Sequence, residues 1–167
     1  PFYHDEGEGR VYLLLDDSNR ELLYQESLPR GVGSNDIGLD RGQLGGDAML
    51  VRFEDAGDRV LLRAANLRYR ADSPSGAERR AVEEAFASAV LWGFPVVAED
   101  DGRQLVDATA FLLRDSHGIA RRLKERGEGD YKADASRSAV YAARSRAFPK
   151  NTELEAVVTF VGDNPGP

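Results

Sequence analysis

The sequence contains no cysteine, and this absence removes both a kind of support and a kind of site. Without cysteine the chain forms no disulfide, and it offers no thiolate to hold zinc.

Histidine is almost as scarce, since His4 and His117 are the only two. Because histidine is the commonest metal ligand and titrates near neutral pH, metal and acid–base chemistry have few possible positions in this chain.

Other absences exclude further classes of protein. No apolar run approaches the ~20 residues that a helix needs to span a bilayer, so we expect no membrane insertion. The net charge of −7 disfavours nucleic acid as a partner, because nucleic acid is itself negative. Neither the zinc-peptidase signature His-Glu-x-x-His nor the nucleophile elbow Gly-x-Ser-x-Gly occurs. We therefore expect no catalytic residue, no metal site and no cofactor in this chain by itself.

The two ends of the sequence indicate a piece of a longer chain. The first residue is Pro1, the only methionine is Met49, and no charged and apolar leader is present. The last four residues, 164–167, are Asn-Pro-Gly-Pro, which is the chemistry of turns and linkers. We predict a single domain over residues 1–167, excised from a longer chain, because this length suits one domain with a real core.

Alternating apolar side chains predict strands that are mostly joined as hairpins. We expect the first two strands to pair across a turn at 16–19, and the third and fourth to pair across a turn at 55–58. A third hairpin is expected around the turn at 100–102. The predicted strands are 11–15, 22–24, 49–54, 60–64, 96–97, 104–106 and 154–160.

A first helix is predicted to begin at Gly76 and to run to about Ser88. Ser75 and Glu78 form a capping box, in which each side chain satisfies a backbone N–H group of the helix start. The apolar stripe of this helix is expected to pack on the sheet. The side chains of that stripe which we expect to be buried are Val82, Phe86 and Ala89.

A second helix is predicted over residues 109–126. Asp107 is a good N-cap for it, Gly118 kinks or splits it, and Gly127 ends it. Residues 134–136 predict one further helical turn ahead of a strand. The complete pattern predicts an α+β fold, namely a mostly antiparallel β-sheet built from hairpins with two helices packed on it.

The glycine-rich loop from Gly31 to Gln43 is the most informative stretch of the sequence. It is neither a phosphate loop nor an EF-hand, because no Gly-Lys-Ser/Thr follows and the terminal Glu is missing. A loop of this length in a compact domain usually has a use, so we predict an interface or binding loop. The simpler alternative is that it folds over its own domain. The side chains that would serve an interface are Ser34, Asn35, Asp36, Ile37, Leu39, Asp40 and Arg41.

Three other clusters contain functional residue types but favour simpler interpretations. His4 stands with three carboxylates between residues 5 and 8, which is typical of a solvated lead-in to the first strand. Residues 115–117 are Asp-Ser-His, but neighbouring helix positions point in different directions, so we expect a helix break and no catalytic relay. Residues 68–70, Arg-Tyr-Arg, are expected at an exposed strand edge.

Several stretches, in order along essentially the whole chain, resemble large bacterial secreted zinc-dependent metalloproteases. The similarity is to the domain that precedes the His-Glu-x-x-His peptidase domain in those proteins. The stretches are 33–43 (GSNDIGLDRGQ), 60–62 (VLL), 66–70 (NLRYR), 106–109 (VDAT), 111–115 (FLLRD), 136–138 (SRS) and 148–153 (FPKNTE).

The resemblance implies a non-catalytic accessory domain of an exported, periplasmic or secreted, zinc-dependent protease. Its expected partner is a downstream peptidase domain of the same polypeptide, which would hold the zinc ion. No catalytic residue or zinc ligand of that family maps onto this sequence. The alternative is a stand-alone module that binds calcium, a glycan or a peptide through the loop from Gly31 to Gln43.

Overall fold

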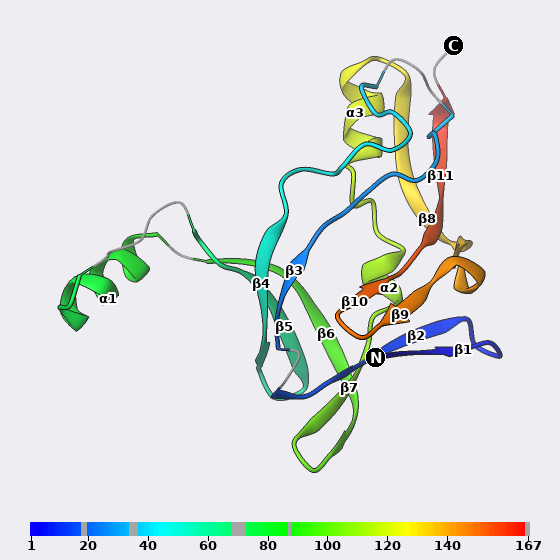
Figure 1. Cartoon of the computed structure of the whole chain (residues 1–167). Helices are drawn as coiled ribbons and strands as arrows, with labels where there is room; N and C mark the ends of the chain where they lie inside the picture. The colour runs from blue at the N-terminus through cyan, green and yellow to red at the C-terminus, as the bar shows by residue number, and fades with distance from the viewer. Residues whose placement is uncertain (18–19, 34–36, 68–72, 87, 166–167) are drawn as a thin grey trace. The chain divides into compact units, whose positions relative to one another are not determined.

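The computed structural model describes all residues except 18–19, 34–36, 68–72, 87 and 166–167. The backbone separates into two compact units, and each unit combines stretches that are far apart in sequence. The cleft unit comprises Pro1–Leu14, Gln25–Asp47 and Asp107–Pro167, and the sheet unit comprises Leu15–Tyr24 and Ala48–Val106. Figure 1 labels the helices and strands of both.

Antiparallel strands in the order β3-β4-β5-β6-β7 form the sheet unit (Figure 1). Because successive residues of a strand face opposite sides, the alternating apolar side chains of the central strands gather in one core. The buried members of that core are Val51, Phe53, Val60, Leu62, Phe94 and Val106. The strands are β3 (Glu21–Tyr24), β4 (Met49–Asp55), β5 (Arg59–Ala64), β6 (Ala89–Asp100) and β7 (Arg103–Asp107).

Two predicted hairpins of the sheet unit are confirmed. Strand β4 pairs with β5 around a turn in which the Asp55 carboxylate accepts the Gly57 N–H at 2.9 Å. Strand β6 pairs with β7, and their turn places Asp101 and Gly102 at φ 46° and 72°. Positive φ at both central residues is the geometry that two-residue hairpin loops prefer, because its twist matches that of the strands.

The hairpin predicted between residues 11–15 and 22–24 is wrong, because β3 pairs with β4. In the observed register Leu22 lies opposite Val51, and Leu23 lies opposite Leu50. A turn signal at 16–19 indicates where the chain reverses, but it does not specify which strand becomes the partner. Here the partner is a strand more than twenty residues further along the chain.

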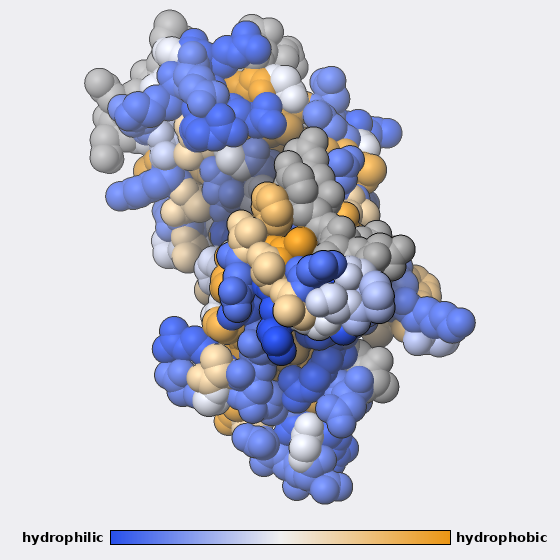
Figure 2. Space-filling view, turned by 90° about the vertical axis from the view of Figure 1, so that its left-hand side faces the viewer, coloured by the Kyte–Doolittle hydropathy of each residue, from blue (hydrophilic) through white to orange (hydrophobic). Residues whose placement is uncertain are grey.

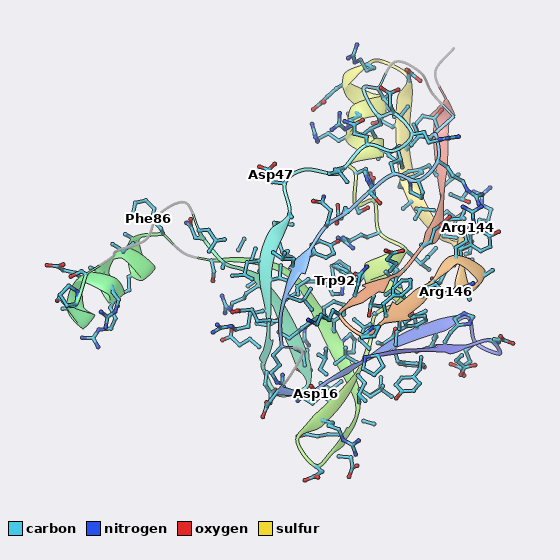
Figure 3. The ribbon with its side chains drawn as sticks, viewed as in Figure 1. Asp16, Asp47, Phe86, Trp92, Arg144 and Arg146 are labelled. Carbon is cyan, nitrogen blue, oxygen red and sulfur yellow. The ribbon has the colours of Figure 1, made fainter. Side chains whose placement is uncertain are left out.

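Helix α1 (Gly76–Ala85) begins where its capping box predicts, since Ser75 Oγ accepts the Glu78 N–H at 3.4 Å. It ends three residues earlier than predicted, and its expected packing is wrong. Phe86 follows the helix and is 41% exposed, and Ala89 is the first residue of β6. Figure 3 shows Phe86 beyond the end of α1, whereas Trp92 lies within the sheet. The apolar stripe is too short, at one Val and one Phe, to hold a two- to three-turn helix against the sheet.

The cleft unit contains two short hairpins, a long pair of strands and two short helices. Helix α3 packs on β8, which pairs with β11 (Figure 1). A 3₁₀ turn over Ala142–Arg144 follows β8. The elements are β1 (Phe2–Asp5), β2 (Arg10–Leu15), α2 (Thr109–Leu112), α3 (Ile119–Glu125), β8 (Gly129–Val140), β9 (Arg146–Phe148), β10 (Asn151–Glu153) and β11 (Ala156–Pro165).

The expected lead-in around His4 is in fact strand β1, which pairs with β2 and places His4 opposite Val11. The turn between the two strands uses one of the three carboxylates that follow His4. The Asp5 carboxylate accepts the N–H groups of Gly7 and Glu8 at 2.9 and 3.1 Å. The Asp5 carboxylate therefore stabilises the turn of a hairpin.

The long helix predicted over 109–126 is split at Gly118, as its sequence indicated. Gly118 has a φ of 64°, a left-handed conformation that glycine adopts without strain. At the start of α2, the Asp107 carboxylate accepts the Thr109 N–H at 2.8 Å. At the end of α3, Gly127 has a φ of 75° and Glu128 donates to the Leu123 carbonyl at 2.9 Å, which is a Schellman-type stop.

The helical turn predicted at 134–136 is wrong, because these residues belong to β8. The hydrogen bonds that would be expected in a turn are nevertheless present, and they form a bulge within the strand. Asp134 lies opposite Thr159 and Ala139 lies opposite Val157, so β8 carries extra residues between these pairs. The Asp134 carboxylate accepts from Ser136 Oγ and Arg137 Nε, both at 2.6 Å. These two hydrogen bonds lower the pKa of Asp134 to about 2, with the Ser136 bond as the larger cause.

The predicted fold class is confirmed as α+β, with mostly antiparallel sheet and short helices. In the part of the chain that the structure describes, no helix is long and apolar enough to cross a membrane. Figure 2 shows a face on which hydrophilic side chains dominate and hydrophobic ones form small scattered groups. Scattered apolar residues are ordinary on a folded surface.

Candidate functional site

The glycine-rich loop enters the core of the cleft unit through Ile37 and Leu39. Ile37 and Leu39 are 2% and 6% exposed and form a buried cluster with Leu123 of α3. Partly buried side chains complete the cluster: Leu28, Val32, Ile119 and Tyr131. For Ile37 and Leu39 the structure therefore matches the alternative in which the loop folds over its own domain.

The polar candidates of the loop divide into two groups. Residues 34–36, which are Ser34, Asn35 and Asp36, lie outside the described residues. Asp40 and Arg41 are exposed at the loop's far end. The backbone of Asp40 makes the turn, since its N–H donates to Gln43 Oε1 at 2.9 Å and its carbonyl accepts the Gln43 N–H at 3.1 Å. Both charged side chains are thus presented to solvent from a fixed turn.

The exit of the loop is fixed by a short antiparallel ladder. The Leu28 N–H donates to the Gln43 carbonyl at 2.8 Å, and the Gly45 N–H donates to the Glu26 carbonyl at 2.9 Å. Ser27 and Leu44 lie opposite one another as an antiparallel β-bridge. The ladder brings the Gly45 backbone against neighbouring side chains. A Cβ atom at Gly45 would lie 3.0 Å from the Glu26 Cβ and 3.4 Å from His117 Nε2, so only glycine fits without a shift.

Arg122 connects this loop to the start of α3. Its Nε donates to the His117 carbonyl and its Nη1 to the Ile37 carbonyl, each at 3.3 Å. Both partners are backbone oxygens in segments that are distant in sequence. One guanidinium therefore holds the loop and the helical corner together.

The Asp115 carboxylate accepts hydrogen bonds from the helix that follows it, α3. Its Oδ1 accepts the Ile119 N–H at 2.7 Å and its Oδ2 accepts the Ala120 N–H at 2.9 Å. These are N–H groups that have no acceptor within the helix, so the carboxylate serves as a cap. The favourable interaction of a carboxylate with the positive end of the helix dipole adds to this effect.

Ser116 and His117 contact one another in the helix break that was expected at residues 115–117. They lie in a turn between the two helices, where Ser116 Oγ is 3.0 Å from His117 Nδ1. His117 Nε2 is buried, and no hydrogen-bond partner for it occurs among the described residues. Because the Asp115 carboxylate bonds to α3, the three side chains do not form the Asp-His-Ser order of a hydrolytic triad.

A half-buried ion pair supports the same corner. Arg114 pairs with Glu26, and both side chains are largely shielded from solvent. The Arg114 guanidinium also lies 3.7 Å from the centre of the Phe111 ring, where a cation is attracted by the ring face. This pair positions the ladder strand of Glu26 relative to the end of α2.

These parts enclose an open cleft of about 570 Å³ within the cleft unit. One wall is the loop exit, and the other is the turn and first part of α3. The lining is mixed, with glycine backbone, leucine and amide side chains on the loop side and carboxylate, hydroxyl, imidazole and guanidinium groups on the other. The lining residues are Leu39, Gln43, Leu44, Gly45, Gly46, Asp115, Ser116, His117, Gly118, Arg121 and Arg122.

Sequence reasoning identified part of this site and missed the rest. The sequence predicted a functional loop at 31–43 and a helix break at 115–117. It did not predict that these two segments lie at the same cleft. It gave no role to Leu44, Arg121 or Arg122. The residues around Leu44 are typical of an exposed segment, and those around the two arginines are typical of an ordinary helix. In the described part of the chain, no three His, Cys, Asp or Glu side chains gather as metal ligands. Residues 68–70 lie outside the described residues.

The sequence profile of a family described as "Domain of unknown function (DUF5117)" matches residues 42–167. This match covers most of the chain. The chain belongs to the DUF5117 family. The matched range includes both the loop exit and the α3 wall of the cleft. No curated protein and no solved structure is detectably similar to this DUF5117 chain.

Proposed function

We propose that this chain is a non-catalytic accessory domain of a bacterial exported zinc-dependent metalloprotease. It would scaffold a downstream peptidase domain of the same polypeptide or shape its substrate cleft. The catalytic zinc would then belong to that domain, and the location would be the periplasm or the exterior. Support for the protease context comes from the motif resemblance along the chain. The DUF5117 match over residues 42–167 supports only the part of the proposal in which this is an uncharacterised domain.

The structural observation that supports the interface role is that the loop from Gly31 to Gln43 is held in place by its own unit. Ile37 and Leu39 anchor the loop in its own core, and the ladder at Leu28 fixes its exit. A loop held in this way keeps Asp40 and Arg41 in one place at the surface, which lowers the entropy lost when a partner binds. Fixed, exposed charges suit contact with another domain.

The test uses Asp40→Ala combined with Arg41→Ala. Both side chains are exposed, so this chain alone should lose less than ~0.5 kcal/mol of stability in urea unfolding. In the longer protein that includes the peptidase domain, the same change should reduce casein cleavage or lower the melting temperature. Substituting Ile37 and Leu39 would not be informative, because their loss would damage the unit's own core.

Arg80→Ala is the matched control, since Arg80 is an equally exposed arginine on α1 and should change neither measurement. Unchanged activity and melting of the longer protein with the double substitution would rule out the interface. The same proposal expects this chain alone to retain no stoichiometric zinc after dialysis and to cleave no casein. One tightly held zinc ion per chain would contradict it.

The alternative function is a binding module that takes calcium, a glycan or a peptide. The open cleft beside the loop exit favours the peptide version, because its lining offers both backbone and charged groups. Calorimetric titration of this chain with calcium and with simple glycans tests the other two versions.

A further inference from the structure

The loop exit presents an unpaired strand edge. In the ladder, the Gln43 carbonyl and the Gly45 N–H face residues 26–28. Backbone groups alternate in direction along a strand, so the N–H and carbonyl of Leu44 between them face away from that partner. Within the described residues, neither Leu44 group makes a hydrogen bond, and Leu44 is 56% exposed. An edge of this kind is a template for another strand.

The glycines beside Leu44 leave this edge open to a second backbone. Gly45 and Gly46 are exposed and line the cleft. A Cβ atom at Gly46 would meet no atom within 4 Å, so the missing side chain there leaves free space beside the edge. The segment is also fixed in an extended form by its ladder to Glu26 and Leu28. The edge is therefore formed before any ligand arrives.

The opposite wall carries two guanidinium groups and one carboxylate, and that carboxylate is held by the helix. Asp115, the acid that lines the cleft, is occupied by two N–H groups of α3. Arg121 is exposed, lines the cleft and pairs with Glu125 at 2.8 Å. Arg122 uses Nε and Nη1 for backbone carbonyls, while its Nη2 makes no hydrogen bond with any described residue. Two guanidiniums thus border the cleft in a chain whose net charge is −7.

We propose that this cleft binds an extended peptide segment that carries an acidic side chain. The peptide backbone would pair with Leu44, and its carboxylate would contact Arg121 and Arg122. Main-chain pairing at a sheet edge supplies affinity, and a charged pocket beside it supplies selectivity. The site lies outside the exposed tip at Asp40 and Arg41, so the inference does not depend on attachment to a peptidase domain.

The probe is a fluorescein-labelled heptapeptide of alternating threonine and valine with glutamate at its centre. Its binding to this chain is measured by fluorescence anisotropy at low and at moderate salt. The same peptide with a central glutamine should bind about fivefold more weakly, as expected for one exposed charged contact. Added salt should weaken the glutamate peptide more than the glutamine peptide, because salt screens charges.

Two pairs of variants locate the peptide. Arg121→Gln should weaken binding of the glutamate peptide about fivefold, while Glu125→Gln, which removes the same ion pair but keeps the cation, should not. Leu44→Pro removes the free N–H group and should weaken both peptides about fivefold, whereas Leu44→Ala keeps it and should have little effect.

Failure of the glutamate peptide to bind at millimolar concentration would overturn the inference. Equal binding by wild type, Arg121→Gln and Leu44→Pro would overturn it as well, because the peptide would then bind elsewhere. Since these measurements need only this chain, they are independent of the outcome for the accessory-domain proposal.

Discussion

The sheet unit and the cleft unit are stabilised in different ways. In the sheet unit, strands that follow one another from β4 to β7 also lie beside one another, and alternating apolar residues form the core. In the cleft unit, three separate stretches are joined by side chains that reach distant backbone, such as Arg122 to Ile37. Local pattern accounts for the run from β4 to β7 of the first unit, whereas the second unit depends on contacts between stretches that are distant in sequence.

The largest expected effect is on the core of the sheet unit. Phe94 is 1% exposed and its ring centre lies 5.8 Å from that of Phe53, so Phe94→Ala should cost about 3–5 kcal/mol in urea unfolding. Phe86→Ala is the matched control, and at 41% exposure it should cost less than ~1 kcal/mol. Equal losses for the two variants would show that α1 packs on the sheet after all.

The same experiment tests the prediction of a single domain. Trp92, the only tryptophan, lies in β6, so its fluorescence follows the sheet unit, while far-ultraviolet circular dichroism follows both units. One cooperative domain requires that both signals change together. If Phe94→Ala moves the fluorescence transition and leaves part of the dichroism transition in place, the two units unfold separately.

A smaller effect is expected in the cleft unit from Asp115→Ala. The substitution removes the acceptor of two N–H groups at the start of α3 and should cost about 1–2 kcal/mol, measured by urea unfolding. Glu125→Ala, at the other end of the same helix, removes only an exposed ion pair and should cost less than ~0.5 kcal/mol. If Asp115→Ala is as mild as its control, polar capping is not what holds this unit.

The smallest effect concerns Asp134 in the β8 bulge. Its folded-state pKa of about 2 is depressed, so its stabilisation is complete above the unfolded value of about 3.9 and is lost as the pH falls through about 2. Asp134→Asn should therefore make stability less dependent on pH between about 4 and 2. A carbon-13 NMR titration should show the Asp134 pKa rising more in Ser136→Ala than in Arg137→Gln. The reverse order would contradict the assignment of causes.

Sequence reasoning succeeded where neighbouring residues decide the structure. The hairpin of β4 and β5, the cap at Ser75, the break at Gly118 and the stop at Gly127 each depend on a few adjacent residues. It failed where a distant segment decides, as when β3 takes β4 as its partner.

The cleft shows the same limit. The mere presence of Ile37 in a glycine-rich loop indicates either an interface or a core, and only Leu123 decides between them. Leu44 and Arg121 carry no local signal at all, because their role depends on the ladder and on the split helix that place them at one cleft. When a side chain contacts backbone that is distant in sequence, neither the hydrophobic periodicity nor the residue spacing of a single sequence identifies its partner.

The interleaving of the two units has a consequence for synthesis on the ribosome. The sheet unit is fully available once Val106 has been made, whereas the cleft unit still lacks its third stretch at that moment. Ile37 and Leu39 must wait for Leu123 before they can be buried, and the unpaired Leu44 edge stays without its α3 wall for the same interval. A nascent chain paused between these points would expose the loop and its glycine-rich edge, which is the state most open to chaperones and to wrong strand partners.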